Sequence, residues 1–217
     1  MKKVRSLALA GLFALVAARC GADTITETFS DDPSQNGWAV FGNTNLFEWT
    51  NQTLSVTWDS TQPNSYFYRS LGTILTKDDD FSISFDLQLK DAVAFSYGAP
   101  LAIGLFHTSD ATNALFSRSG STGINFSEFD FFPDTGFGDS IDATLKDNQG
   151  DFAGYYFAYD NLPLDPTMVY HVTLTHTAGT LVLTGLVRTN GQVYTSLPGS
   201  YGNGLTNFFV DAMSISS

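Results

Sequence analysis

Two acidic residues in an aromatic run are the side chains of this sequence best suited to chemistry. Glu128 and Asp130 stand in the run Phe-Ser-Glu-Phe-Asp-Phe-Phe that ends at Phe132. Side chains alternate across a strand, so both carboxylates would project from one face. Such a pair can ligate a cation, bind ligand hydroxyl groups or share the acid and base work of glycoside hydrolysis. The alternative is an acidic pair on a solvated face, with Arg69 or Arg118 as its partner.

Aromatic side chains near these carboxylates would add a surface on which a sugar ring can stack. Tyr66 and Tyr68 are two residues apart and would share one face of a strand, and Trp58 precedes them. Their flat rings offer apolar contact area in a fixed orientation. The candidate ligand-binding residues are therefore Glu128, Asp130, Trp58, Tyr66 and Tyr68, whereas most other aromatic residues are expected to fill the core.

A second group of carboxylates could hold a structural calcium ion. Asp31 and Asp32 follow the first expected strand and Asp211 lies on the last one. The terminal strands of a sandwich commonly lie side by side, which would gather three carboxylates, and carboxylate oxygens are the ligands that calcium prefers. The alternative is that Asp31 and Asp32 form an ordinary solvated turn with the Pro-Ser that follows them.

The first 22 residues have the features of a secretory signal peptide. A basic start precedes the apolar run 7–18, which is too short to span a bilayer as a stable helix. Small residues then fit a signal-peptidase site, so cleavage is expected after Ala22, with an earlier cut near Ala18 as the alternative. We therefore expect a secreted protein, extracellular, periplasmic or at the cell surface, with one domain over residues 23–217.

The single cysteine, Cys20, would leave with this leader. A lipid anchor on Cys20 is disfavoured because Arg19 replaces the small residue that lipoprotein processing expects. We expect no stable membrane anchor elsewhere, because no second long apolar segment follows. The expected domain is then free of disulfides and depends on its core, with or without a bound ion.

The chain is strongly acidic once the leader is removed. Four of its 10 lysine and arginine residues lie in residues 1–22, so 6 remain against 22 aspartate and glutamate residues, a formal charge of −16. Nucleic acid and anionic membranes are poor partners for such a surface. The excess of carboxylates supplies oxygen ligands for calcium without requiring that any calcium is bound.

Hydrophobic periodicity after the leader predicts an all-β fold. Apolar and polar residues alternate, and clusters of Gly, Asn, Asp and Pro interrupt them at roughly 10-residue intervals. The dipeptide Asn190-Gly191 predicts a two-residue hairpin turn. This pattern predicts a two-sheet antiparallel β-sandwich of the jelly-roll type. The expected strands are Thr24–Phe29, Thr53–Trp58, Ser65–Arg69, Phe81–Leu89, Leu101–Phe106, Ile124–Phe132, Tyr155–Tyr159, Val169–Thr175, Thr180–Val187 and Phe208–Ile215.

Four segments, taken in order, resemble the middle strands of concanavalin A-like lectin and glucanase domains. They are FSISFDLQL (81–89), LAIGLF (101–106), INFSEFDFF (124–132) and YHVTLTHTAGTLVLT (170–184). The last segment resembles the laminin G-like pattern of an aromatic-His-Val strand, a turn and a Leu-x-Leu strand. The resemblance extends over roughly half of the chain after the leader and implies a concanavalin A-like jelly roll.

Within this superfamily, family 16 glycoside hydrolases carry a nucleophile, an assisting Asp and an acid/base on one strand as Glu-x-Asp-x-(x)-Glu. The resemblance puts Glu128 at the nucleophile position and Asp130 at the assisting position. Phe132 and Pro133 occupy the positions of the third carboxylate and cannot donate a proton, so the catalytic pattern is incomplete. Legume-type lectins carry a similar Glu-Phe-Asp strand, in which the acidic pair helps to organise metal ions.

Three functions are consistent with these residues. The favoured one is a non-catalytic, lectin-like carbohydrate-binding or surface-recognition domain that binds a polysaccharide or glycoconjugate on one sheet face. The second is a glycan-cleaving hydrolase or lyase, with Glu128 as nucleophile or base and Tyr68 or His107 as proton donor. The third is a structural exoprotein without a small ligand, in which side chains from residues 148–159 would block the candidate face.

Overall fold

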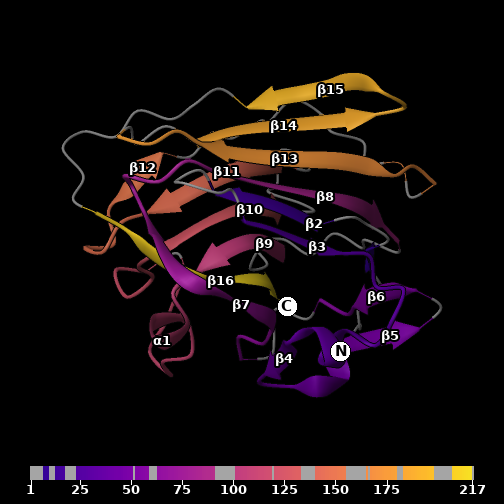
Figure 1. Cartoon of the computed structure of the whole chain (residues 1–217), viewed down its shortest axis with the longest axis horizontal. Coiled ribbons are helices and arrows are strands. Elements are labelled where there is room, and N and C mark those ends of the chain that lie inside the picture. The colour runs from indigo at the N-terminus through magenta and orange to yellow at the C-terminus, as the bar shows by residue number, and fades with distance from the viewer. Residues whose placement is uncertain are drawn as a thin grey trace.

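The computed structural model describes residues 7–9, 13–17, 23–50, 52–58, 63–90, 101–118, 120–132, 140–154, 165, 167–179, 183–197 and 207–216. Within these residues the chain is built almost entirely of strands (Figure 1). The helices of this part of the chain are the α-helix α1 (Thr108–Ala111) and the 3-10 helices η1 (Pro33–Asn36) and η2 (Thr44–Leu46). None of these helices has the length and apolar character that a membrane span requires.

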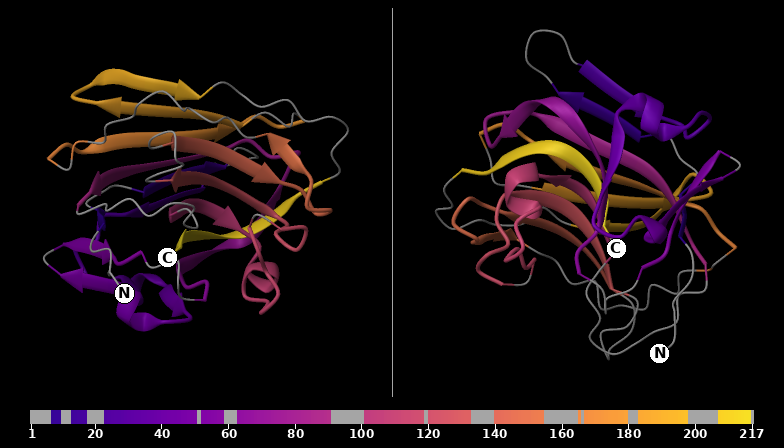
Figure 2. Two further views of the ribbon diagram at one scale, coloured as in Figure 1. Left: turned by 180° about the vertical axis from the view of Figure 1, so that it is seen from behind. Right: turned by 90° about the horizontal axis from the view of Figure 1, so that it is seen from below.

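The described strands form two antiparallel sheets, as the sequence predicts (Figures 1 and 2). The first sheet has the order β15 (Gln192–Leu197), β14 (Leu183–Thr189), β13 (Tyr170–His176), β8 (Phe81–Leu89), β1 (Leu7–Leu9), β6 (Thr53–Val56) and β5 (Phe47–Thr50), and β2 (Phe13–Ala17) also pairs with β8 and carries β3 (Asp23–Glu27). The second sheet has the order β12 (Phe152–Gly154), β11 (Ser140–Lys146), β10 (Phe126–Phe132), β9 (Leu101–Phe106), β16 (Phe209–Ser216), β7 (Tyr66–Thr76) and β4 (Trp38–Phe41).

Most of the expected strands correspond to strands of the structure. β8 and β9 have the predicted bounds. Asn190 and Gly191, between β14 and β15, both have positive φ, as the predicted hairpin turn requires. The strands β4, β5, β11 and β12 are not among the expected ones. Three of these four have at most four residues, too few for alternation to stand out. The expected strand Tyr155–Tyr159 lies outside the described residues.

The core lies between the two sheets and is built from the apolar side of each alternating strand. In β8 every second residue is buried, from Phe81 to Leu89, and the residues between them are partly exposed. Phe85 of β8 and Phe129 of β10 meet edge to face, with ring centroids 5.9 Å apart. Each fully buried phenylalanine side chain contributes about 1.5–3 kcal/mol to stability. Packing between the inner faces therefore joins the sheets into a sandwich.

Two strands of the first sheet come from the stretch that the sequence predicts to be a leader. β2 pairs with β8 along the register from Ala14–Ser84 to Ala17–Phe81, and β1 pairs with Gln88 and Leu89 of the same strand. On their other sides, β2 pairs with β3 and β1 pairs with β6. In the full chain, β1 and β2 therefore separate β8 from strands that follow the predicted cleavage site.

A buried carboxylate, Glu27, connects the end of β3 to the second sheet. Glu27 Oε2 accepts hydrogen bonds from Trp38 Nε1 at 3.0 Å and Asn36 Nδ2 at 3.2 Å, and Arg69 Nη1 lies 4.0 Å away. Glu27 Oε1 accepts from Phe29 N at 2.7 Å. Phe29 adopts φ 55°, a conformation that bulky residues rarely take. The carboxylate thus stabilises a strained turn that buries the Phe29 ring.

We expect Glu27→Gln to lower the free energy of unfolding by about 2 kcal/mol, because the amide cannot accept the same set of bonds and stays buried. Urea denaturation would measure the change. Glu48→Gln is the matched control, because Glu48 is exposed on β5. The control should stay within about 0.5 kcal/mol of the unmodified protein. Equal effects of the two substitutions would contradict the anchoring role of Glu27.

Candidate functional site

Glu128 and Asp130 project from the face of β10 that points away from the sandwich core. Phe129 and Phe131, which alternate with them, are packed inside that core. The two carboxylates share one face, as predicted, yet both are buried, with exposed fractions of 1% and 6%. The alternative of a solvated acidic pair is therefore wrong, because another part of the chain covers this face.

Short side chains on the neighbouring strands leave room beside the carboxylates. Glu128 lies opposite Gly104 of β9, and Gly104 lies opposite Ser214 of β16. Ala102 lies opposite Asp130. A Cβ atom at position 104 would collide with the main chain of β10, so the glycine permits the close approach of the two strands. Next to the acidic pair, this strip of the sheet carries only small side chains.

The connection between β9 and β10, residues 107–125, forms a cover segment over this face. Its ends meet in a 3.0 Å hydrogen bond from His107 N to Asn125 O. Asn125 has φ 57°, which asparagine tolerates, and its side-chain amide is hydrogen-bonded on both sides. Asp211 of β16 accepts from Thr108 N and Thr108 Oγ1, both at 2.7 Å. Both ends of the cover segment are therefore fastened to the second sheet.

Arg118 of the cover segment is the counter-ion of the acidic pair. Its Nε donates to Glu128 Oε1 at 2.8 Å. Its guanidinium carbon lies 5.3 Å from the ring centroid of Tyr66 and 5.7 Å from that of Phe116. Burial alone would lower the pKa of Arg118, but the neighbouring Glu128, Tyr66 and Asp130 outweigh it and raise that pKa. Arg118 is thus held as a cation between the carboxylate and two aromatic rings.

Lys146 of β11 holds the tip of the cover segment in place. Its ammonium donates to the main-chain oxygens of Arg118 and Gly120, both at 2.8 Å. The ring of Phe152 lies over the ammonium, with its centroid 4.2 Å from Nζ. Burial lowers the pKa of Lys146, and the nearby carboxylates offset part of this effect. The site therefore contains two cations and two carboxylates.

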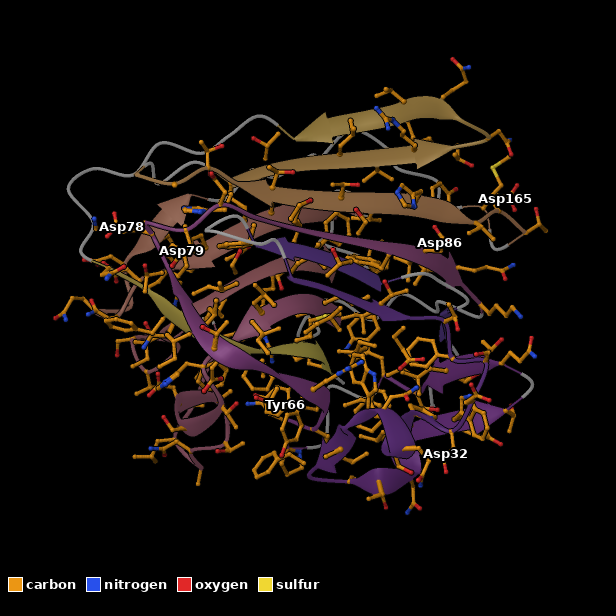
Figure 3. The ribbon with its side chains drawn as sticks, in the orientation of Figure 1. Asp32, Tyr66, Asp78, Asp79, Asp86 and Asp165 are labelled. Atoms are coloured by element: carbon orange, nitrogen blue, oxygen red, sulfur yellow. The ribbon has the colours of Figure 1, made fainter. Side chains whose placement is uncertain are left out.

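Three buried polar atoms at this site have no hydrogen-bond partner among the described residues. They are Glu128 Oε2, Tyr66 Oη and Ser214 Oγ. Glu128 belongs to β10, Ser214 to β16 and Tyr66 to the adjacent β7, where Figure 3 labels it. Buried polar groups are nearly always hydrogen-bonded. An acceptor oxygen and two hydroxyl groups on this face are therefore unsatisfied within the described part of the chain.

The Tyr66 hydroxyl is kept neutral to a higher pH than an ordinary tyrosine. Burial raises its pKa, the Arg118 charge lowers it in part, and the Glu128 charge raises it further. Arg118 lies close enough to influence the hydroxyl, although the two do not form a well-aligned hydrogen bond. Phe106 and Phe41 pack on the Tyr66 ring at 5.1 and 5.9 Å. Tyr66 is therefore a fixed, neutral hydroxyl group.

The structure gathers four of the five candidate ligand-binding residues on one sheet. Tyr68 lies opposite Ser214 on β7 and is partly buried, packed near Phe106 with ring centroids 6.0 Å apart. Trp58 does not join them, because it follows β6 in the other sheet and packs against the main core. Tyr66 and Tyr68 are covered rather than displayed as an open aromatic platform.

His107, which the sequence offers as a proton donor for an enzyme, lies at the base of the cover segment. Its Nδ1 is 2.8 Å from Asp110 Oδ2, and its Nε2 is 3.8 Å from Asp211 Oδ2. The hydroxyl group that lies beside the Glu128–Arg118 pair belongs to Tyr66, not to the expected Tyr68. Tyr66 is therefore the tyrosine that contacts Arg118.

Asp31, Asp32 and Asp211 are not brought together as an ion site. Within the described part of the chain, no three His, Cys, Asp or Glu side chains are grouped so that they could hold a metal ion. Asp32 instead caps η1 by accepting from Ser34 N at 2.9 Å (Figure 3). The prediction depends on adjacent terminal strands, but β3 belongs to the first sheet and β16 to the second.

Some partners of the acidic pair can be predicted from the sequence, and others cannot. Of the two arginines that the sequence offers, the structure selects Arg118, and Arg69 lies beside Glu27 instead. Lys146 is missed, although the alternation in β11 could have placed it in phase with a polar face. No sequence signal marks Ser214, because only the pairing of β16 with β9 brings it to the site.

No model of a known protein family matches this chain, and no curated protein sequence matches it. The fold and the site define its class. It is an all-β antiparallel sandwich with a buried, ion-paired polar cluster on the outer face of one sheet.

We expect Arg118→Met to lower the free energy of unfolding by about 3 kcal/mol, because it leaves the Glu128 carboxylate buried without its cation. The double variant Arg118→Met/Glu128→Leu should recover about half of that loss or more, since an apolar pair of similar volume has no charge to desolvate. Urea denaturation of both variants provides the measurement. A single variant as stable as the unmodified chain would show that the ion pair does not form.

We expect Tyr66→Phe to change the alkaline limit of stability. The pKa of Tyr66 is higher in the folded chain than in the unfolded one, so unfolding releases a proton above pH about 10. The contribution of Tyr66 is therefore complete below that pH and is lost as the pH rises through its folded-state pKa. Unfolding free energies should be measured at about pH 8, 10 and 11, on either side of the ordinary tyrosine pKa. With rising pH they should fall more steeply for the unmodified chain than for Tyr66→Phe. Parallel curves would contradict the burial of a neutral hydroxyl.

Proposed function

We propose that this chain is a secreted, non-catalytic carbohydrate-binding protein whose ligand is a polysaccharide or glycoconjugate bound at the Glu128 face. The observation that carries the proposal is the set of buried atoms without partners among the described residues: Glu128 Oε2, Tyr66 Oη and Ser214 Oγ. Each such group costs about 1–3 kcal/mol when its hydrogen bond is missing. Three on one face favour a ligand that supplies those bonds.

A sugar has the hydrogen-bonding groups that this set of atoms requires. Glu128 Oε2 can only accept, the guanidinium of Arg118 can only donate, and the hydroxyl groups of Tyr66 and Ser214 can do both. Each sugar hydroxyl also donates and accepts, so neighbouring hydroxyls can bind a carboxylate and a guanidinium side by side. A simple anion offers acceptors only and would leave Glu128 without a donor.

The charges at the site favour a neutral sugar over an acidic one. Glu128 and Asp130 are matched by Arg118 and Lys146, which are two of the 6 basic residues that follow residue 22. The chain as a whole is acidic, so a polymer rich in uronic acids would be repelled as it approached. A neutral polysaccharide does not meet this barrier.

Ligand entry requires the tip of the cover segment to move, because Glu128 and Tyr66 are almost fully buried. The tip is held by polar contacts: the Lys146 ammonium on two main-chain oxygens, the Arg118–Glu128 pair, and Asn64 Nδ2 donating to Phe116 O at 3.2 Å. Hydroxyl groups of a sugar can replace contacts of this kind. The fastened ends at Asn125 would act as the fixed base of the movement.

The resemblance to concanavalin A-like domains supports the same function. Two antiparallel sheets in a sandwich are compatible with that jelly roll. On the sequence resemblance, Glu128 and Asp130 of β10 would correspond to the acidic strand of lectins and glucanases of this kind. Because such sandwiches also host hydrolases, lyases and structural modules, the site rather than the fold carries the proposal.

A glycan-cleaving enzyme is the second candidate, and one observation favours it. Tyr66, a neutral proton donor, and Glu128, a nucleophile or base, both contact the Arg118 guanidinium. Against it stands the ion pair itself, since one Glu128 oxygen is already occupied by the Arg118 hydrogen bond at 2.8 Å.

Binding of the secreted product of the full chain to an array of neutral and acidic polysaccharides tests the proposal. We expect retention on neutral glycans. Glu128→Gln and Tyr66→Phe should each weaken it about tenfold, because each removes one hydrogen-bonding group. Asp86→Asn is the matched control, since Asp86 pairs with His171 on the outer face of the first sheet and should have no effect (Figure 3).

A reducing-end assay on the same glycans separates the candidates. New reducing ends that disappear in Glu128→Gln would favour the enzyme over the binding protein. Retention on the array without new ends supports the binding protein. Absence of retention on every glycan would overturn the proposal and leave the structural exoprotein as the function to test.

A further inference from the structure

The strands β1 and β2 form a wedge, one strand wide, in the middle of the first sheet. Both pair with the same edge of β8: β2 along residues 81–84 and β1 at residues 88–89. On the other side of the wedge lie β3, paired with β2, and β6, paired with β1. Figure 1 shows β2 between β8 and β3. Among the described residues, β8 does not pair directly with β3 or with β6.

Removal of the predicted leader would take away both strands of the wedge. The edge of β8 would then expose unpaired main-chain groups next to buried side chains, including Phe81 and Ile83. An unpaired buried N–H or C=O group costs about 1–3 kcal/mol, and an open edge invites pairing with other chains. Some strand must therefore replace the wedge if the leader is removed.

The strands beyond the wedge already have the side-chain orientation that a replacement needs. Ile25 of β3 and Ile83 of β8 are both register partners of Leu15, so they fall in one cross-strand row. Ile25 packs against the core that contains Ile83. Val56 of β6 and Leu89 of β8 are likewise partners of one residue of β1, and both are buried. A sideways step by one strand would keep every apolar residue on the core face.

We propose that cleavage of the leader is followed by a rearrangement of the first sheet, the closing step. In this step β3 and β6 move sideways by one strand spacing, about 4.8 Å, and pair directly with β8. The proposal rests on the predicted cleavage and not on the proposed carbohydrate function. β3 is the natural occupant of the edge, because it loses its strand partner when β2 leaves. Two antiparallel steps separate β3 from β8, so the new pair is parallel, an arrangement that mixed sheets contain.

The contacts of Glu27 and Phe29 define the pivot of the movement. Glu27 is bound to Trp38 and faces Arg69 in the second sheet, and Phe29 is buried in the core. These groups hold the end of β3 while residues 23–26 swing toward β8. The leader would thus keep the edge of β8 occupied until it is removed.

Cysteine pairs can measure the step, because Cys20 is the one cysteine of the chain. Thr24 and Ser82 are both partners of Val16 and lie in one row, away from the Glu27 pivot. Two strand spacings, about 10 Å, separate them while β2 is present, which is too far for a disulfide, whereas adjacent strands are within reach. Cys20→Ser keeps a small residue at the processing site and removes the native thiol.

The test variant is Cys20→Ser/Thr24→Cys/Ser82→Cys, oxidised with oxidised glutathione. It is made as the full chain in two ways: exported by a bacterial host, and synthesised in a cell-free system without membranes so that the leader stays. Intact mass gives the processing state. We expect a cross-linked fraction about tenfold higher in the processed chain than in the unprocessed one. Cys20→Ser/Ser82→Cys/Thr175→Cys is the matched control, because those two hydroxyl groups already lie 3.5 Å apart on paired strands, and it should cross-link in both preparations.

Each other outcome would overturn the proposal. An exported chain that keeps residues 1–22 would make the wedge a permanent part of the sheet. A processed chain in which only the control pair cross-links would leave β3 away from β8. A disulfide between two molecules would assign the edge of β8 to a second copy of the chain, and equal cross-linking in both preparations would show that β2 does not separate the strands.

Discussion

The ion pair between Glu128 and Arg118 is the interaction on which the second sheet and its cover depend. A carboxylate on the outer face of a sheet is stable in water, but Glu128 is almost fully buried and needs a cation. Arg118 supplies that cation from the cover segment, and Lys146 fixes the main chain that carries Arg118. Gly104 permits the close approach of β9 to β10 beside Glu128. Without the pair, the cover segment would keep its hydrogen bonds to Lys146 and Asp211, but Glu128 would be buried without a counter-ion.

The two buried glutamates differ in how completely their oxygens are hydrogen-bonded within the described chain. Both oxygens of Glu27 accept hydrogen bonds, from Phe29, Asn36 and Trp38, so that its acceptors are occupied within the chain. Glu128 has one oxygen bound to Arg118 and one without a partner among the described residues. A saturated carboxylate stabilises a fold, whereas a half-saturated one next to unpaired hydroxyl groups retains binding capacity. This contrast, rather than burial or charge alone, separates the anchor from the candidate site.

The first sheet depends on partners for the edge of β8, just as the second depends on a counter-ion for Glu128. β8 alternates without interruption between buried and partly exposed residues, and it pairs on one side with β13 and on the other with β1 and β2. A long apolar strand cannot leave one edge open at low cost, because its main-chain groups require partners. The segment that the sequence predicts to direct export therefore also occupies a position in this sheet.

The fold class, the clearest strands and the shared face of the acidic pair can be predicted from the sequence, because they follow from local alternation and turn chemistry. The alternation at residues 81–89 predicts β8 with its observed bounds, and Asn190-Gly191 predicts the observed turn. The tertiary structure alone decided that Arg118 rather than Arg69 neutralises Glu128, that Ser214 lies in the same row, and that Asp211 lies apart from Asp31 and Asp32. Strand order and loop placement set these neighbours, and they depend on contacts between distant segments that no local pattern encodes.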